Sequence, residues 1–451
     1  MKIKLIIPKE PTRENLFDPS PTKASGIHFY NSTIAYLAAL TPPEIEVELV
    51  DLDLEEIDYD DKVDLVGITL WTRLANSAYE TADEFRKRGV PVVLGGNHPS
   101  LMLEEAKKHA DAVVVGEGEL VWPTLLKEFK DKKHFNNGGV AKAKEKHNLK
   151  NLPVPRYELF KHYEQYIPLF ALFASRGCPF RCHFCSDSKF NGGIQRRRPV
   201  GEVIEWANSY RKNYLSNSHH PRPDLLSICF TDTNLWVNPN YARELFKALI
   251  PLKITWTSQG SITAVKHPDI IKLAAESGCR EMAVGFETID PNTLKQDINK
   301  IQNKIEEYEH FISLMKQKGI SIRGTFMFGN DHDELDAFEN TLEFIEKNCI
   351  EIPLVMIATP FPGTQFYERL EEEKRIFERD WSYYNCLNLV FTPKTDKKVF
   401  KKHFMEFFTR LYSEEGINKR LKDVTSSVPW CVNETLHNYV NSFDKERWIN
   451  A

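Results

Sequence analysis

The sequence predicts an α/β protein with two parallel sheets, one in each half of the chain, followed by a small and mostly helical C-terminal region. Short apolar runs alternate with helical patterns from residue 1 to about 130, and again from about 169 to 393. Such alternation of strand and helix is typical of parallel α/β folds. The chain has 451 residues, which is enough for two or three domains that each have a core of their own.

Five predicted strands and four predicted helices make up the first domain, which we assign to residues 1–135. The strands are Lys2–Pro8, Glu46–Leu52, Asp64–Thr69, Pro91–Gly95 and Ala112–Val115, and the helices are Tyr30–Leu40, Asn76–Arg88, Leu101–His109 and Val121–Phe129. This order predicts a doubly wound sheet that binds any ligand at the carboxyl ends of its strands. A polar, lysine-rich stretch then indicates a linker, which we place at residues 136–165.

Six further strands alternate with helices in the second domain, which we assign to residues 166–380. These strands are Phe170–Ser175, Leu226–Thr231, Thr255–Gly260, Glu281–Gly285, Ser321–Met327 and Val355–Thr359. Six βα units predict a partial (β/α)6 barrel whose chemistry takes place at the C-terminal strand ends. Residues 381–451 are predicted to be mostly helical, because Phe404, Phe407, Phe408 and Leu411 recur at helical spacing.

The composition indicates an ordinary soluble protein. The formal net charge of −5 leaves no basic footprint, so we expect no nucleic-acid partner. No run of about 18 apolar residues occurs, so we expect no transmembrane segment. The eight cysteines do not form a disulfide framework in a chain of this length, and this indicates a cytoplasmic protein.

Three of these cysteines form the most informative motif of the chain. Cys178, Cys182 and Cys185 are spaced C-x3-C-x2-C, and Gly177 and Pro179 favour a loop over a helix. A four-iron cluster normally takes four cysteine ligands, so three local thiolates suggest a cluster with one open iron. The alternative is a three-cysteine zinc site that His183 or a distant residue completes.

The motif follows the first barrel strand, and in that position it resembles the radical SAM superfamily. The open iron of that superfamily chelates the amino and carboxylate groups of S-adenosylmethionine (SAM). The resemblance therefore implies a [4Fe–4S] cluster and SAM as cofactors. It also implies an electron donor such as ferredoxin or flavodoxin.

Two segments of the first domain, Val92–Pro99 and Ala110–Glu119, resemble the cobalamin-binding domain that precedes the radical SAM domain in one branch of the superfamily. That branch includes hopanoid C-methylases and bacteriochlorophyll enzymes. The resemblance implies a Rossmann-like cobalamin-binding domain and cobalamin as a third cofactor. Four glycines at strand ends, where backbone can approach a ligand closely, are the candidate cofactor contacts: Gly95, Gly96, Gly116 and Gly118. The alternative is that these glycines serve tight βα turns, as in any doubly wound fold.

The motif D-x-H-x-x-G, whose histidine coordinates cobalt in methionine synthase-like proteins, does not occur here. The resemblance therefore implies that another residue covers the lower face of cobalamin. Trp71, in the loop after the third strand, is the first candidate, and Arg73 is the second. The alternative for Trp71 is a partly buried core aromatic.

The barrel strand ends provide four candidate contacts for SAM. By resemblance, Asp232 receives the amino group, although a second acid that often follows it is replaced here by Thr233. Gln259, Ser261 and Glu287 are candidates to hold the ribose, carboxylate or sulfonium end. The alternatives are a helix cap for Asp232 and ordinary polar strand ends for the other three.

The resemblance implies a C-methyltransferase. An electron from the cluster cleaves SAM, the resulting 5′-deoxyadenosyl radical removes hydrogen from an unactivated carbon, and methylcobalamin provides the methyl group. No catalytic side chain is assigned. The substrate is a protein side chain, such as a glutamine of methyl-coenzyme M reductase, or a lipid, a pigment or another small molecule. Two alternatives are a related enzyme that forms or rearranges rings or couples carbons without methylation, and a non-catalytic iron–sulfur protein.

Overall fold

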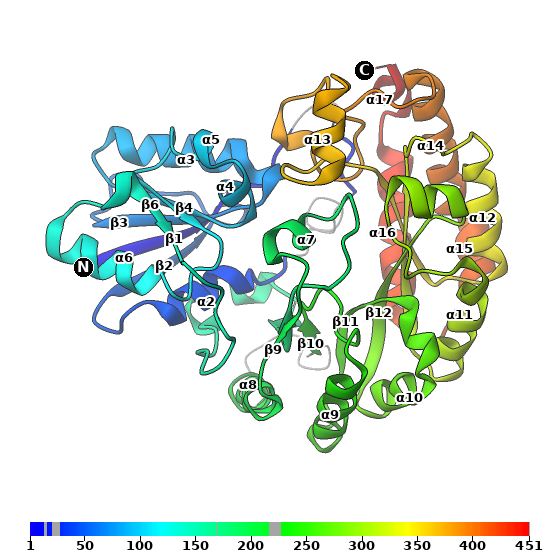
Figure 1. The fold of residues 1–451 in the computed structure, drawn as a ribbon, viewed down its shortest axis with the longest axis horizontal. Helices are drawn as coiled ribbons and strands as arrows, with labels where there is room; N and C mark the ends of the chain where they lie inside the picture. The colour runs from blue at the N-terminus through cyan, green and yellow to red at the C-terminus, as the bar shows by residue number, and fades with distance from the viewer. Residues whose placement is uncertain (13–15, 20–27, 168, 216–226, 451) are drawn as a thin grey trace.

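The computed structural model describes residues 1–12, 16–19, 28–167, 169–215 and 227–450. It contains two six-stranded parallel sheets with helices packed against them, and a helical region follows the second sheet (Figure 1). The α/β fold class predicted from the sequence is therefore confirmed. The predicted start of the second barrel strand, Leu226, lies outside the described residues.

The first sheet has the strand order β2-β1-β3-β4-β5-β6, and all neighbouring strands are parallel. Its strands are β1 (Lys2–Ile7), β2 (Glu46–Asp51), β3 (Leu65–Thr69), β4 (Val92–Gly95), β5 (Ala112–Val115) and β6 (Val140–Lys142). Its helices are α2 (Ser32–Leu40), α3 (Ala75–Lys87), α4 (Asn97–Leu101), α5 (Leu103–Ala106) and α6 (Trp122–Lys132). Figure 1 shows α3 and α5 on one side of this sheet and α2 and α6 on the other, which is the doubly wound arrangement.

Strand β6 corrects the predicted linker. It lies within the stretch that we expected to connect the domains, yet Val113, Val114 and Val115 of β5 pair with it in parallel. This strand is only three residues long and lysines follow it, so it has almost no apolar pattern by which a strand could be predicted. Short, charged edge strands are a common way of protecting the side of a sheet. The first domain therefore extends beyond residue 135.

The second sheet has the order β14-β13-β12-β11-β10-β7, again parallel throughout, with β7 and β14 at its edges. Its strands are β7 (Leu169–Leu172), β10 (Ser227–Phe230), β11 (Trp256–Gly260), β12 (Cys279–Glu287), β13 (Ser321–Phe328) and β14 (Ile352–Ile357). Its helices are α8 (Val200–Leu215), α9 (Pro239–Leu249), α10 (Pro268–Glu276), α11 (Tyr308–Gln317), α12 (Ala337–Lys347) and α13 (Gln365–Glu372). Proline in the first turn of α9 and α10, and the caps from Asn238 and Thr364, explain where three of these helices begin.

The C-terminal helices pack on the barrel and also hold the N-terminal segment. They are α14 (Lys397–Leu411), α15 (Glu414–Leu421), α16 (Ser427–Ser442) and α17 (Lys445–Asn450). The four predicted apolar positions of α14 are buried. The ring of Phe17 contacts the rings of Phe408, Phe443 and Trp448 at centroid distances of 4.9 to 5.9 Å. The segment at Phe17 and the last helices therefore share one core.

No helix in the described parts of the chain is both long and apolar enough to cross a bilayer.

Candidate active site between the two sheets

A cavity of about 400 Å³ lies where the carboxyl ends of the two sheets approach each other. Its walls come from the loops after β3, β4 and β5 of the first domain and after β7 and β10 of the second. Both domains thus present the edge at which parallel α/β folds bind ligands. Aromatic side chains line much of the wall: Tyr36, Trp71, Trp122, Phe173, Phe190 and Trp206.

All four predicted glycines lie on the cavity wall. Gly96 and Gly116 have φ angles of 108° and 84°, which side chains rarely adopt. A Cβ atom on Gly96 would lie 2.4 Å from the Leu70 carbonyl oxygen, so no larger residue fits there. At Gly116 the position of a Cβ has no atom within 4 Å, so bare backbone faces open space. This part of the wall, which we call the glycine wall, allows a large ligand to approach the main chain closely.

The structure separates the two candidates for the lower face of cobalamin. Trp71 is 55% exposed and lines the cavity, so it is not the core aromatic of the alternative interpretation. Arg73 is not among the described residues that line the cavity. Its Nη2 lies 2.7 Å from Asp18 Oδ2 and 2.5 Å from Glu10 Oε2. Two carboxylates of the N-terminal segment therefore hold Arg73 in a structural role.

The cysteine triplet lies in a loop between two short antiparallel strands, β8 (Ser175–Arg176) and β9 (Arg196–Arg197). Gly177 opens the loop with φ 82°, and a Cβ there would lie 2.2 Å from the Ile194 carbonyl oxygen. Helix α7 (Ser186–Asn191) begins directly after the third cysteine. Cys178 is buried, Cys182 and Cys185 are partly buried, and all three are free thiols.

Side-chain amides of the barrel approach two of these thiols. Asn234 Nδ2 lies 3.9 Å from Cys178 Sγ, and Gln302 Nε2 lies 3.8 Å from Cys182 Sγ. Burial raises the pKa of all three thiols, and that of Cys185 to about 11. The protein alone therefore keeps the thiols protonated, and a bound metal must stabilise the thiolates, as coordination does.

His183 anchors the cysteine loop. Its backbone N–H donates to the Ile298 carbonyl at 3.0 Å, and its Nδ1 donates to the Asp297 carbonyl at 2.9 Å. The carbonyl oxygen of His183 accepts from the backbone N–H of Phe366 in α13 at 3.1 Å. In the zinc interpretation His183 was the possible fourth ligand. Here its Nδ1 bonds to the Asp297 carbonyl oxygen, which leaves Nε2 as the ring nitrogen that could bind a metal.

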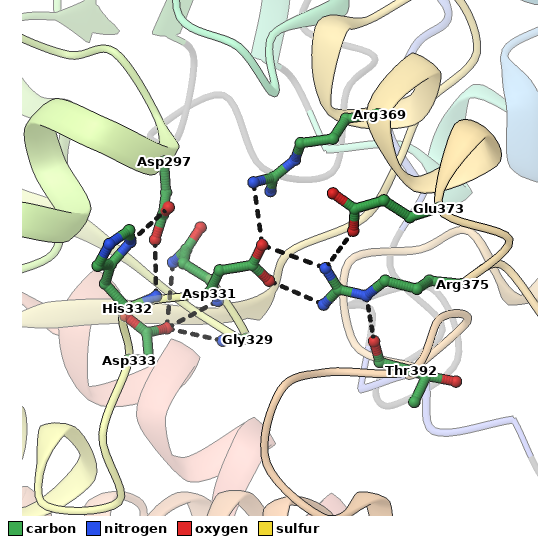
Figure 2. A network of polar contacts seen from close by, with 10 residues as sticks. Asp297, Gly329, Asp331, His332, Asp333, Arg369, Glu373, Arg375 and Thr392 are labelled. Carbon is green, nitrogen blue, oxygen red and sulfur yellow. Dashed lines mark hydrogen bonds and ion pairs between the residues drawn. The ribbon is translucent and has the colours of Figure 1, made fainter.

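A polar network extends this anchor to the C-terminal region (Figure 2). His332 lies beside Asp297, with its Nδ1 2.8 Å from Asp297 Oδ1 and its backbone N 2.9 Å from Oδ2. The neighbouring Asp331 accepts from Arg369 at 3.0 Å and from Arg375 at 2.8 Å. Residues more than 180 positions away thus fix the cysteine loop, and no local sequence signal could reveal this.

Asp232 has a structural role that differs from the predicted one. Its carboxylate accepts from the backbone N–H groups of Ala174 and Ser175 at 2.9 and 2.5 Å, and from the Ser175 hydroxyl. Burial raises the pKa of Asp232 to about 6, against these hydrogen bonds. Both of its oxygens hold the chain that enters the cysteine loop.

Asn234, two residues further on, lies beside the first cysteine of the motif. It is 3% exposed, and its Nδ2 donates to Ser261 Oγ at 3.0 Å in addition to approaching Cys178. Its Oδ1 is buried and has no partner within the described chain. A buried amide oxygen without a partner is costly, so this acceptor, beside a cysteine, suits a ligand ammonium group.

The three remaining SAM candidates lie around the barrel interior. Ser261 is buried, and its Oγ also lies 2.6 Å from Thr263 Oγ1. Gln259 is exposed and lies on the strand face opposite Trp256, which packs against α9. Glu287 is 6% exposed and pairs with Lys300 at 2.6 Å. The structure thus leaves Gln259 accessible, whereas intramolecular partners occupy the other two.

A cluster of two glutamates and two arginines, which the sequence analysis did not single out, joins the two domains. Glu117 lies between two of the cavity glycines, and its Oε1 is 2.5 Å from Arg196 Nη2 and 3.2 Å from Arg176 Nη1. Arg176 also pairs with Glu119 at 2.5 Å. These arginines belong to β8 and β9, which flank the cysteine loop. We refer to Glu117, Glu119, Arg176 and Arg196 as the interdomain clamp.

We expect the variant Glu117→Gln to be less stable by on the order of 3 kcal/mol, because it leaves the largely buried guanidinium group of Arg196 without its carboxylate partner. Although burial acts to raise it, the pairs with Arg196 and Arg176 lower the pKa of Glu117 to about 2. The stabilisation is therefore complete above about pH 4.5 and disappears as the pH falls towards 2. Urea unfolding between pH 3 and 7 measures both effects.

The control is Glu339→Gln, which removes an exposed pair with Arg410 and should change stability by less than about 1 kcal/mol. Equal losses of unfolding free energy in the two variants, or an unchanged pH dependence of stability in Glu117→Gln, would contradict the stabilising role of the clamp.

Comparison with known proteins identifies the chain. Residues 172–345 match the radical SAM superfamily, and residues 28–126 match the B12 binding domain. Residues 364–441 match a domain of unknown function, DUF4070. The bacteriochlorophyllide d C-8(2)-methyltransferase of Chlorobaculum tepidum is 32% identical over 413 residues, which cover 86% of each chain. The chain belongs to the cobalamin-dependent radical SAM family.

Two further comparisons agree with this membership. The bacteriochlorophyllide d C-12(1)-methyltransferase of the same organism is 29% identical over 392 residues, covering 86% of this chain and 83% of the relative. The solved structure of the cobalamin-dependent SAM radical enzyme OxsB, with aqua-cobalamin and SAM bound, has the same fold. Its TM-score is 0.69 at 16% identity, covering 100% of this chain and 72% of that chain.

As a radical SAM methyltransferase with a cobalamin-binding domain, the enzyme uses a [4Fe–4S] cluster, SAM and cobalamin. Its residues fit these groups, because three free thiols share one loop with amide donors and the glycine wall faces a cavity. Within the described ranges, no three His, Cys, Asp or Glu side chains converge on a single ion. A four-iron cluster does not require this, since each thiolate binds a different iron.

Proposed function

We propose that this enzyme transfers a methyl group from SAM, by way of cobalamin, to an unactivated carbon of its substrate. The observation that supports this most is that residues of the cysteine loop (Gly177, Asp187, Phe190 and Asn191) line the same cavity as the glycine wall, although the three cysteines themselves are not among its lining residues. When bound, the cluster and SAM supply the radical chemistry that removes hydrogen, and cobalamin supplies the methyl group. Radical removal of hydrogen and delivery of methyl must occur at the same carbon, so the two cofactors need a shared cavity.

The chain's own residues position the reactants and keep water away. The glycine wall would hold the corrin ring close to the main chain, and Trp71 would cover it without providing a strong cobalt ligand. The interdomain clamp holds the glycine wall and the cysteine loop at a fixed separation. The aromatic lining excludes water from the space between them, which protects a reactive carbon.

Asn234 takes the role expected of Asp232 in binding SAM, through its buried Oδ1 beside Cys178. We expect Asn234→Ala to weaken SAM binding by about 10- to 100-fold, the usual effect of losing one hydrogen bond to a charged group. Equilibrium dialysis with the reconstituted enzyme measures the dissociation constant.

The comparison variant is Asp232→Asn. Because Asp232 holds Ala174 and Ser175, we expect this change to lower the free energy of unfolding more than the affinity for SAM. If Asp232→Asn weakened SAM binding strongly while Asn234→Ala did not, the assignment of the two residues would be reversed.

For the substrate, we propose a bacteriochlorophyllide-type pigment as the first class to test. Two relatives that align over most of the chain are named as bacteriochlorophyllide methyltransferases. The aromatic lining of the cavity suits a flat, largely apolar ring system, because aromatic side chains bury large areas against such rings.

The test is anaerobic turnover of the reconstituted enzyme with SAM that carries a deuterated methyl group. The substrates are a bacteriochlorophyllide, a hopanoid lipid and a glutamine-containing peptide, each in a separate reaction. Mass spectrometry should find one labelled methyl group on a pigment carbon. Label on the lipid or the peptide instead would support the proposed methyltransferase activity and contradict the pigment as the substrate. A pigment changed in mass without any label would support ring formation or rearrangement and reject the proposed function.

A further inference from the structure

A short segment that follows β12 in the chain lies along the cysteine loop. The carbonyl oxygen of Ile298 accepts from the backbone N–H of His183 at 3.0 Å. The side chain of Asn299 donates from Nδ2 to the carbonyl oxygen of Arg181 at 3.0 Å. The two residues of the loop that make these bonds are the sequence neighbours of Cys182 on its two sides. The segment therefore runs beside the middle cysteine of the motif.

This segment, residues 298–303, also carries a side-chain donor that reaches the cysteine, and we call it the cover segment. The amide of Gln302 donates from Nε2 to Cys182 Sγ at 3.8 Å. Both residues are partly buried, and partial exclusion of water strengthens a hydrogen bond between them. The amide of Asn234 differs, because its Nδ2 donates to Ser261 Oγ at 3.0 Å as well as approaching a thiol.

Buried contacts hold the cover segment in place on both sides of Gln302. Lys300 is 8% exposed, and its Nζ donates to Glu287 Oε1 at 2.6 Å and to the Gly285 carbonyl oxygen at 2.9 Å. Asn303 is 3% exposed, and its Nδ2 donates to the same carbonyl oxygen at 2.9 Å. A Cβ atom on Gly285 would meet Lys300 Nζ, so a larger residue there would displace the ammonium group. The donor of Gln302 therefore has a fixed place beside the cysteine.

An N–H group that points at a cluster thiolate favours the reduced state of the cluster. Reduction adds one negative charge, part of which resides on the sulfur ligands, and hydrogen bonds to charged acceptors are the stronger ones. Hydrogen bonds to the sulfur atoms are one of the means by which proteins set the reduction potential of a cluster. Removal of such a donor therefore makes the potential more negative.

We propose that Gln302 is a positioning residue that raises the reduction potential of the cluster through its hydrogen bond to Cys182. A higher potential allows the cluster to accept its electron from a weaker reductant. In that step one electron enters the cluster from an external donor, and no bond is made or broken. The inference concerns the cluster site and goes beyond the proposed function, which the labelled-methyl experiment tests independently.

The test compares three variants of the reconstituted enzyme before SAM is added. Gln302→Met keeps the length of the side chain and removes the donor, whereas Gln302→Lys keeps an N–H donor and adds a positive charge. Asn299→Ala removes the neighbouring bond to the Arg181 carbonyl oxygen, which does not involve a thiol. Metal analysis first compares the iron content of each variant with that of the unmodified enzyme. Stepwise reduction with titanium(III) citrate and redox mediators, followed by EPR of the reduced cluster, then gives the midpoint potential.

We expect Gln302→Met to keep its iron and to have an equilibrium constant for one-electron reduction about 10-fold lower, which corresponds to a potential about 59 mV more negative. The potential of Gln302→Lys should equal or exceed that of the unmodified enzyme, and Asn299→Ala should leave the potential unchanged. An unchanged potential in Gln302→Met, or an equal fall in Asn299→Ala or Gln302→Lys, would overturn the proposal. Loss of iron in Gln302→Met would assign the residue to holding the cluster loop and would also overturn it.

Discussion

Replacing Cys182 with alanine is expected to abolish reductive cleavage of SAM. The motif supplies three thiolates from one loop, and the loop leaves one iron open for SAM, so loss of a thiolate leaves the cluster with too few ligands to persist. We expect the iron and sulfide content to fall after reconstitution and formation of 5′-deoxyadenosine to fall to the background of a reaction without protein. Metal analysis and chromatography of the nucleoside products measure these two effects.

The control for this variant is Cys431→Ala, which removes an exposed cysteine of α16, far along the chain from the motif. It should keep the full iron content and activity. A Cys182→Ala protein with a normal cluster and normal cleavage of SAM would contradict the assignment of the motif as the cluster site.

Replacing Gly116 with leucine is expected to prevent cobalamin binding. The backbone at Gly116 has φ 84°, and its Cβ position points into open space at the cavity wall, so a leucine would occupy the place of the ligand. The dissociation constant for cobalamin should rise by more than about 10-fold, which corresponds to more than about 1.4 kcal/mol. Visible absorption of the bound corrinoid measures the affinity.

Gly89→Leu is a matched control for the strain of a side chain at positive φ. Gly89 lies in the same domain with φ 77° and has no atom within 4 Å of its Cβ position, but it does not line the cavity. Both variants should lose about 1–2 kcal/mol of stability from the left-handed backbone. Only the variant at Gly116 should lose cobalamin, and equal binding by the two would contradict the site.

Much of the fold could be predicted because its signals are local. Buried parallel strands such as β1 and β3 are short apolar runs, and the amphipathic pattern of α14 repeats every three or four residues. Strand β6 could not be predicted in this way, because three residues that end in a lysine carry no pattern. Its place in the sheet depends on pairing with β5, which lies 25 residues earlier.

Parts of the candidate site could be predicted where the chemistry requires a fixed spacing of residues along the sequence. They could not be predicted where the role of a residue depends on the direction of its side chain. The cysteine motif and the glycines at strand ends are of the first kind. Asp232 and Asn234 are of the second, since a shift of two residues decides which of them holds the loop and which lies beside Cys178. Glu117 is of a third kind, because its partner Arg196 is 79 residues away.

The last part of the barrel domain contributes to the site in a way that its sequence did not suggest. The backbone N–H of Phe366 in α13 donates to the carbonyl oxygen of His183, and Asp331 pairs with Arg369 and Arg375. The position of the cysteine loop therefore depends on contacts between distant parts of the barrel and not on the motif alone.

The ratio of two nucleoside products tests the central claim most directly. The reaction is anaerobic turnover with the compound that the enzyme methylates. One SAM provides the methyl group and leaves S-adenosylhomocysteine, and a second provides the radical and leaves 5′-deoxyadenosine. The account predicts that the two nucleosides form in equal amounts, each matching the methylated product. Formation of 5′-deoxyadenosine and a changed substrate without S-adenosylhomocysteine would contradict it.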